Sequence, residues 1–303
     1  MKVSDRTKGI LLMTASALCF AFMSVAVKRT GGTIPAYEQV FFRNLVIVIV
    51  AGAYLLWHHL PLYGPRQYQP AMFGRSILGV LGVLASFLAT NTGSQADVSI
   101  LSRLSPFLIT AFSALFLKEK ITKIQIPALL LAFGGAFVVA NPKFHSNMYP
   151  IVMALLCSLA SSFSYTLVGY LKGKAHPFSI ILHLGTVSVA TMVPVMLLTR
   201  QFVWPTGQEL FDLLLIGIFG VLGQICLTYA YKLADASEVS IYSNTNILFA
   251  AILGRVFFGE RIAPNTLVGG GMVLAAMILV SVFGRREKEA ARRAAKQAGR
   301  TAA

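Results

Sequence analysis

Residues 98–121 read VSILSRLSPFLITAFSALFLKEKI, and residues 239–262 read VSIYSNTNILFAAILGRVFFGERI. The two stretches align without a gap at a constant spacing of about 141 residues, which is close to half of the 303-residue chain. Both begin with Val-Ser-Ile and both carry a glutamate, Glu119 or Glu260, just before their final isoleucine. An internal repeat of this length in a very apolar chain is typical of membrane transporters built from two copies of one unit.

The composition indicates that the bilayer is the solvent for most of the chain. Hydrophobic residues make up 56% of the sequence, charged residues 12%, and the mean hydropathy is +0.71. Apolar runs long enough to cross a hydrocarbon core recur along the whole chain. The predicted fold is an all-α integral membrane protein with ten transmembrane helices, at about 9–28, 38–57, 71–90, 98–117, 124–141, 148–170, 178–198, 210–231, 239–258 and 266–284.

The lysines and arginines outside these spans predict the orientation. With the N-terminus inside, the inner segments carry 17 of them and the outer loops carry 5. Both termini are therefore expected in the cytoplasm, and the location expected is a bacterial inner membrane. This bias and an affinity for anionic lipid account for the net charge of +15 without nucleic acid as a partner.

Five spans in each copy would invert the second copy relative to the first. The expected organisation is a five-helix repeat at 1–143, an inverted five-helix repeat at 144–284 and a basic cytoplasmic tail at 285–303. Inverted copies can form two gates around a site at the membrane midplane, so alternating access is expected. The tail either lies as a helix on the inner leaflet or is solvated, and the chain is a monomer or a homodimer.

The repeated segment also carries a resemblance to a known family. The first copy has Pro106, then Glu119 and the pair Gly134-Gly135, and the second has Glu260 followed by Gly269. In this pattern, and over nearly its whole length, the chain resembles the ten-span, EamA-type branch of the drug/metabolite transporter superfamily. The resemblance implies a cavity lined by spans one, three, four, six, eight and nine. It also implies transport of amino acids, amines, carboxylates, nucleotide-like metabolites or drugs.

The second copy departs from the pattern at one position. Ile247 stands where the first copy has Pro106. Proline kinks a helix because it lacks the backbone N–H and clashes with the preceding turn. A kink is therefore expected in span four and not in span nine.

Two arginines inside spans are the leading candidates for a substrate site, since a charge within the membrane is normally retained for a cavity or a partner. Arg103 in span four and Arg43 in span two both lie about 8 Å below the outer surface. Together they could bind a carboxylate or phosphate. Alternatively, they reach the interface or pair with Glu38 and Asp97. Two arginines nearer the span ends are predicted to be interfacial anchors: Arg75 and Arg255.

Span nine holds the most polar stretch of any span, Ser240 to Asn246. Such groups are costly against lipid, so they are expected to face the cavity or to bond neighbouring helices. Asn244 occupies the position that matches Arg103 in the first copy. The further candidates for contact with substrate are Tyr242, Asn246, Ser102, Ser243, Tyr165, Gln224 and Asn91.

The repeated glutamates are predicted to be structural. Glu119 and Glu260 follow helix ends and lie beside basic residues, so they are expected to cap the next helix or to pair with those neighbours, Lys118, Lys120 and Arg261. No acidic residue falls in the middle of a span. Proton coupling through a buried carboxylate is therefore not predicted, and facilitated diffusion, exchange or coupling through the substrate's own proton is favoured.

The sequence does not favour an enzyme. It has no G-x-S-x-G or H-E-x-x-H motif, and no catalytic residue, metal ligand or cofactor is predicted. The expected partners are the lipid bilayer and a small-molecule substrate. The favoured function is secondary transport of small polar metabolites, with amino acids or related carboxylates first. The alternatives are a carrier of organic cations or amines, with Tyr165 and Tyr242 as an aromatic cage, and a non-transporting scaffold or sensor.

Overall fold

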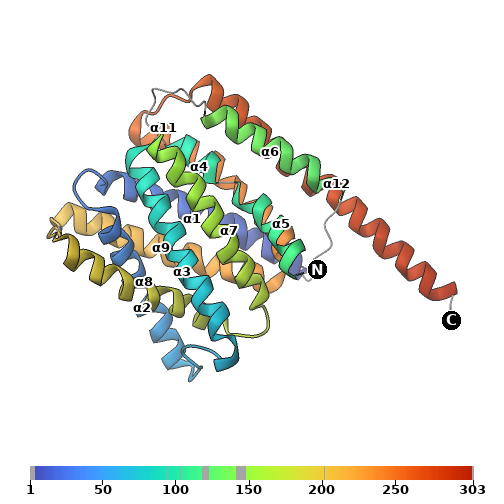
Figure 1. Cartoon of the computed structure of the whole chain (residues 1–303), viewed down its shortest axis with the longest axis horizontal. Helices are drawn as coiled ribbons and strands as arrows, with labels where there is room; N and C mark the ends of the chain where they lie inside the picture. The colour runs from blue at the N-terminus through green and yellow to red at the C-terminus, as the bar shows by residue number, and fades with distance from the viewer. Residues whose placement is uncertain are drawn as a thin grey trace.

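The computed structural model describes residues 4–93, 95–102, 104–117, 123–140, 148–200 and 202–301, and these are helical apart from short connections (Figure 1). The predicted all-helical class is therefore confirmed for the described part of the chain. Seven helical stretches within it are long and apolar enough to cross a membrane. They are α1 (Asp5–Thr30), α2 (Ala36–Trp57), α3 (Gln69–Thr92) with the 3-10 turn η1 (Arg66–Tyr68) before it, Ile100–Leu117, α7 (Tyr149–Tyr170), α8 (Pro177–Thr199) and α9 (Gly207–Leu233).

Local sequence signals set the ends of these helices. The Ser4 hydroxyl accepts a hydrogen bond from the Thr7 amide at 3.2 Å and caps α1, whose last turn carries Lys28 and Arg29. At α9, the Glu209 carboxylate accepts a hydrogen bond from the Thr206 amide at 2.7 Å in a capping box. We refer to the two ends of the bundle by the two ends of α1, as the Asp5 end and the Thr30 end.

Two predicted spans are interrupted. The span at 98–117 contains α4 (Gln95–Ser102) and α5 (Ser105–Leu117), and the span at 239–258 contains α10 (Ala236–Val239), η2 (Ser240–Thr245) and α11 (Asn246–Phe258). The prediction of an uninterrupted span nine is therefore wrong. Serine, asparagine and threonine side chains compete for backbone hydrogen bonds and weaken an α-helix, so η2 is a 3-10 turn without any proline.

The helices pack in pairs that the internal repeat explains. The α1–α9 pair has its repeat counterpart in α7–α3, while α2 packs against α8 and α6 (Gln125–Ala140) packs against α12 (Pro264–Thr301). In Figure 1 the α6–α12 pair lies at one side of the bundle. A Cβ atom added at Gly135 of α6 would lie 2.6 Å from the Gly269 oxygen of α12, so glycine permits the close approach of these two helices.

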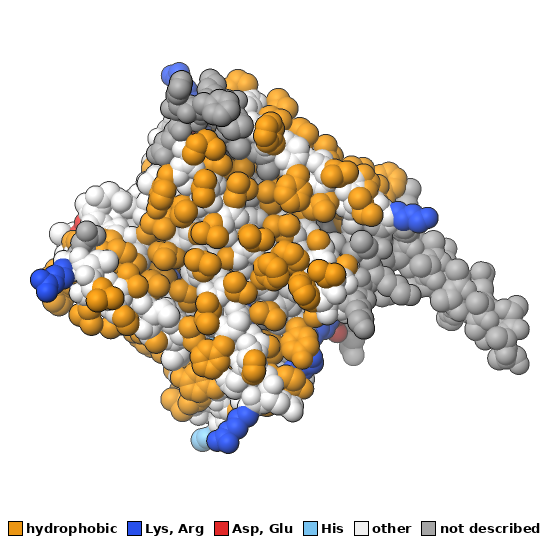
Figure 2. Space-filling model, viewed as in Figure 1, with side chains coloured by type: hydrophobic (Ala, Val, Ile, Leu, Met, Phe, Trp, Pro, Cys, Tyr) orange, Lys and Arg blue, Asp and Glu red, His pale blue; other side chains and the backbone are white. Residues whose placement is uncertain are grey.

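The surface is apolar over the face shown in Figure 2, where hydrophobic side chains cover most of the described area and lysines and arginines gather at the margins. Large apolar side chains with most of their area exposed include Trp57, Leu115, Phe137, Leu198 and Trp204. Such a surface is expected of a protein that contacts lipid. The last helix, α12, continues without a break to Thr301 and extends past the rest of the bundle, so the predicted tail is helical up to this residue (Figure 1).

Candidate functional site

A cavity of about 110 Å³ lies inside the bundle, and we call it the central cavity. Its lining residues come from α1, α3, α4, α5, α7, α9 and η2, which are the spans that the family resemblance implied, together with Arg43 of α2. Seven serines line it: Ser16, Ser24, Ser86, Ser102, Ser105, Ser161 and Ser243. The cavity thus combines hydroxyl groups and one guanidinium with aromatic side chains, which suits a small polar ligand.

The lining residues follow helical faces. Ser16, Phe20 and Ser24 are spaced four residues apart along α1, and Ser161 and Tyr165 have the same spacing along α7. Sequence reasoning identified Tyr165 and did not identify the α1 face. The four-residue spacing of Ser16, Phe20 and Ser24 was the signal available in the sequence.

Arg43 is a fully buried cation in the wall of the central cavity, with 1% of its surface exposed. Its Nη1 donates a hydrogen bond to Asn44 Oδ1 at 3.2 Å, and its Nε has no hydrogen-bond partner. A Cβ atom at Gly220 of α9 would lie 2.9 Å from Arg43 Cγ, so the glycine makes room for this side chain. Among the described residues no carboxylate pairs with Arg43. Because arginine stays protonated, the wall carries a positive charge that is not paired with any described carboxylate.

Arg75 is buried inside the helix bundle. The prediction of an interfacial anchor is wrong, because only 1% of Arg75 is exposed. Its Nη1 donates to Ser164 Oγ at 2.7 Å, and its guanidinium carbon lies 5.6 Å from the centre of the Tyr165 ring. A Cβ atom at Gly79, one turn further along α3, would lie 2.4 Å from Arg75 Nη1. The glycine therefore lets the side chain fold inward along its own helix.

The structure brings four of the predicted site residues to the central cavity, namely Arg43, Ser102, Tyr165 and Ser243. Of these, Ser102 has a buried hydroxyl without a hydrogen-bond partner. Arg103, the leading candidate, lies outside the described residues. The others predicted do not line the cavity: Asn91, Gln224, Tyr242, Asn244 and Asn246.

Most of these other side chains have partners elsewhere. Asn246 Nδ2 donates to the Ala17 oxygen at 2.7 Å, and Gln224 Nε2 donates to Thr228 Oγ1 at 3.3 Å. Tyr242 packs against an apolar cluster at the Asp5 end. Asn244 differs from them, because it is fully buried and neither atom of its amide has a hydrogen-bond partner in the described part of the chain.

A second pocket, of about 130 Å³, lies at the Asp5 end of the bundle. Its lining includes Lys172, His176 and Lys232. Burial, followed by the charges of Lys232 and His58, lowers the pKa of His176, so the imidazole is neutral at pH 7. The positive charge at this pocket therefore comes from the lysines.

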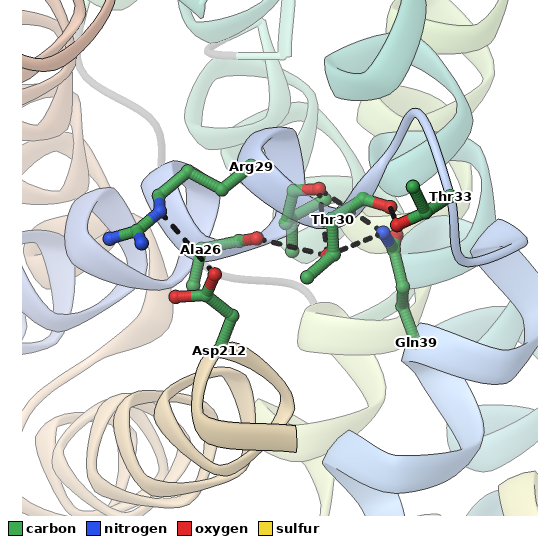
Figure 3. A network of polar contacts seen from close by, with 7 residues as sticks. Ala26, Arg29, Thr30, Thr33, Gln39 and Asp212 are labelled. Atoms are coloured by element: carbon green, nitrogen blue, oxygen red, sulfur yellow. Dashed lines mark hydrogen bonds and ion pairs between the residues drawn. The ribbon is translucent and has the colours of Figure 1, made fainter. Parts of the chain in front are cut away.

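The Thr30 end of the bundle is tied by a polar network, part of which Figure 3 shows. Arg29 Nε lies 3.3 Å from Asp212 Oδ2, and Gln39 Nε2 donates to Thr30 Oγ1 at 2.8 Å (Figure 3). Asn91 belongs to the same network, because its Nδ2 donates to Gln39 Oε1 at 3.2 Å. These contacts join α1 to α2, α3 and α9.

An ion pair lies at the same end. Lys28 pairs with Glu260, donates a hydrogen bond to the Gly93 oxygen at 3.1 Å, and lies 5.2 Å from the Phe258 ring centre. Glu260 was predicted to cap a helix or to pair with the neighbouring Arg261. Its ion pair in the structure is with Lys28, which is distant in sequence and lies near the end of α1. Glu119 lies outside the described residues.

Comparison with known proteins places this architecture in a family. The model of the EamA-like transporter family matches twice, over residues 7–141 and 148–282. A relative from Pseudomonas aeruginosa, the pseudopaline exporter CntI, is 32% identical over 90% of this chain and 95% of its own length. A riboflavin transporter from Rhizobium johnstonii is 27% identical over 90% of each chain.

A solved crystal structure supports the fold. It matches with a TM-score of 0.72 over 92% of this chain and 98% of its own, at 16% identity. The two matches of the family model and the similarity of full-length relatives agree with the multi-pass helical architecture. The chain belongs to the EamA-like transporter family, within the drug/metabolite transporter superfamily.

Proposed function

We propose that this membrane transporter is a secondary carrier that moves small carboxylate-bearing metabolites, amino acids or their relatives, across the inner membrane. The observation that carries the proposal is Arg43, a fully buried cation in the cavity wall without a carboxylate partner among the described residues. A charge inside a membrane protein is costly unless a partner offsets it. A substrate carboxylate would offset this charge and accept a bidentate hydrogen bond from the guanidinium.

The proposed mechanism is alternating access between two inverted five-helix repeats, 1–143 and 144–284, with both termini in the cytoplasm. The packing supports it, because α1–α9 and α7–α3 are equivalent pairs. The breaks support it too, since α5 and α11 begin and end at repeat-equivalent positions. In this orientation the Thr30 end is the outer end, and the network around Lys28 and Glu260 holds it closed.

The relatives support a small organic metabolite as cargo. One is named for export of pseudopaline and another for transport of riboflavin. Their cargoes differ, so the substrate of this chain is argued from its own cavity. Ser102 and Ser105 line that cavity on either side of Arg103 in the sequence, so Arg103 stays a proposed binding residue, with Ser243 and Tyr165.

The alternative, a carrier of organic cations, would need an aromatic cage free of positive charge. Tyr165 and Tyr242 were the predicted cage. The ring of Tyr165 already faces the Arg75 guanidinium, and Tyr242 does not line the central cavity. A cationic ligand at Tyr165 would be repelled by Arg75, so the arrangement disfavours this alternative.

Ligand-induced thermal stabilisation of the purified full-length protein tests the proposal, because a ligand raises the melting temperature only by binding the folded state. We expect glutamate or glutarate to stabilise the wild-type protein and to lose this effect in Arg43→Gln. Arg255→Gln is the matched control, since Arg255 is exposed near the end of α11. Stabilisation by amines alone, unchanged in Arg43→Gln, would replace the proposal with the cation carrier.

A further inference from the structure

Arg75 and its surroundings extend the proposed function, on which this inference rests. We propose that Arg75 is a second anion-binding group beside the central cavity, covered by Tyr165 and Tyr231, and that the transported substrate therefore carries two separated acidic groups. A simple monocarboxylate would occupy only the subsite at Arg43.

The position of Arg75 against the cavity wall is the first observation. Tyr165 and Tyr231 both line the central cavity, with their ring centres 5.9 Å apart. The Arg75 guanidinium carbon lies 5.6 Å from the Tyr165 ring centre. Tyr165 therefore both contacts the Arg75 guanidinium and lines the cavity, with Tyr231 packed beside it.

The incomplete bonding of Arg75 is the second observation. Ser164 accepts the hydrogen bond from Nη1, and the Ser164 hydroxyl in turn donates to the Arg75 backbone oxygen at 2.7 Å. The Nε and Nη2 atoms of Arg75 are buried and have no hydrogen-bond partner among the described residues. A buried N–H group without an acceptor is costly, so this arrangement leaves two donors available to an anion.

The charge balance of the interior is the third observation. The ion pairs between described side chains are Lys8–Asp5, Lys28–Glu260, Arg29–Asp212 and Lys172–Asp235, and none includes Arg43 or Arg75. Neither buried guanidinium thus forms an ion pair with a described acidic side chain, and the buried Glu38 carboxylate accepts a hydrogen bond from the Val203 amide. One carboxylate can offset only one of the two guanidinium charges, whereas a dicarboxylate offsets both.

A movement of the covering tyrosines would give the substrate access to Arg75. A tyrosine ring face attracts a guanidinium, so Tyr165 holds Arg75 while the cavity is empty. A rotation of the Tyr165 side chain would replace this ring contact with a substrate carboxylate, which forms stronger, charge-assisted hydrogen bonds with the free Nε and Nη2. Binding of the second acidic group at Arg75 would then require the movement of Tyr165 in the cavity wall.

Calorimetric titration of the purified full-length protein with matched acids tests the inference. The probes are the dicarboxylates from malonate to adipate, each compared with the monocarboxylate of the same chain length, such as glutarate with valerate. We expect the best dicarboxylate to bind wild-type protein at least about tenfold more tightly than its matched monocarboxylate. In Arg75→Gln this preference should fall to within about twofold, whereas Arg255→Gln should keep it.

The outcomes separate this inference from the function on which it rests. Equal affinity of wild-type protein for the two members of every pair would overturn the second subsite and leave the carboxylate carrier standing. A preference that survives in Arg75→Gln would also overturn it. Failure of every probe to bind wild-type protein would overturn both. The wild-type comparison needs no variant, so the test holds even if Arg75→Gln does not fold.

Discussion

Glycines decide where the buried arginines lie. At Gly79, Gly82 and Gly220 an added Cβ atom would collide with Arg75 Nη1, Ser161 Oγ or Arg43 Cγ. The missing side chains thus create the space in which the cavity polar groups sit. For this protein the residues with no side chain are as important to the site as those with a charge.

Substituting one of these glycines should displace the arginine beside it. In Gly79→Ala the new Cβ would lie 2.4 Å from Arg75 Nη1 and 2.9 Å from Leu184 Cδ1, so Arg75 must move. We expect a loss of about 1–3 kcal/mol of stability, measured as a lower melting temperature. The control is Gly271→Ala in α12, where a Cβ meets nothing within 4 Å. Equal melting temperatures for the two variants would contradict this account.

Among the helices, the sequence correctly predicted the equivalence of α5 and α11 but did not predict the break in span nine. The repeat spacing predicted equivalent helices, and α5 and α11 are each 13 residues long at equivalent positions. A prediction based on proline alone places a kink in span four, at Pro106, and does not find the break in span nine. Polar side chains at Ser240–Thr245 interrupt that helix without a proline.

In this broken segment, leucine substitutions at Asn244 and Asn246 should change the stability of the protein in opposite directions. Both polar atoms of the Asn244 amide are buried without partners among the described residues. Asn244→Leu should therefore increase the free energy of unfolding by about 1–3 kcal/mol and raise the melting temperature. Asn246→Leu should lower it, because Asn246 loses its bond to the Ala17 oxygen. Thermal unfolding of both variants checks the pair. Destabilisation by Asn244→Leu would show that its amide has a partner in the protein.

For the whole molecule, the sequence predicted the family, the helical class and the spans that line the cavity. The direction in which each side chain points could not be predicted from the sequence. Depth along a span placed Arg75 near an interface, but only packing against α7 shows that it turns inward to Ser164. The pairing of Lys28 with Glu260 was also beyond reach, since it joins the two halves of the chain.

This long-range ion pair makes a prediction about gating. Glu260→Gln removes the charge that holds Lys28, so the proposed outer end should open more often. In a background without Cys19, Cys157 and Cys226, a cysteine at Ser24 in the cavity wall should react several-fold faster with an impermeant outside reagent. Asp5→Asn, which breaks an exposed pair at the other end, should leave the rate unchanged. Equal rates in both variants would exclude this gate.

The proposed orientation has its own test. A cysteine at Arg200, which is exposed where α8 ends, should react with an impermeant reagent added outside intact cells. A cysteine at Lys174, in the connection between α7 and α8, should react only after the cells are opened. The reverse pattern would place both termini outside.

Substrate transport into proteoliposomes directly tests whether Arg43 binds a transported carboxylate. Wild-type protein, Arg43→Gln and Arg255→Gln would be reconstituted side by side, and uptake of labelled glutamate and glutarate would be measured with the same substrate trapped inside. We expect uptake by wild-type protein and Arg255→Gln and a loss of at least about tenfold in Arg43→Gln, since the buried guanidinium binds the carboxylate. Equal uptake in all three proteins would contradict a carboxylate site at Arg43.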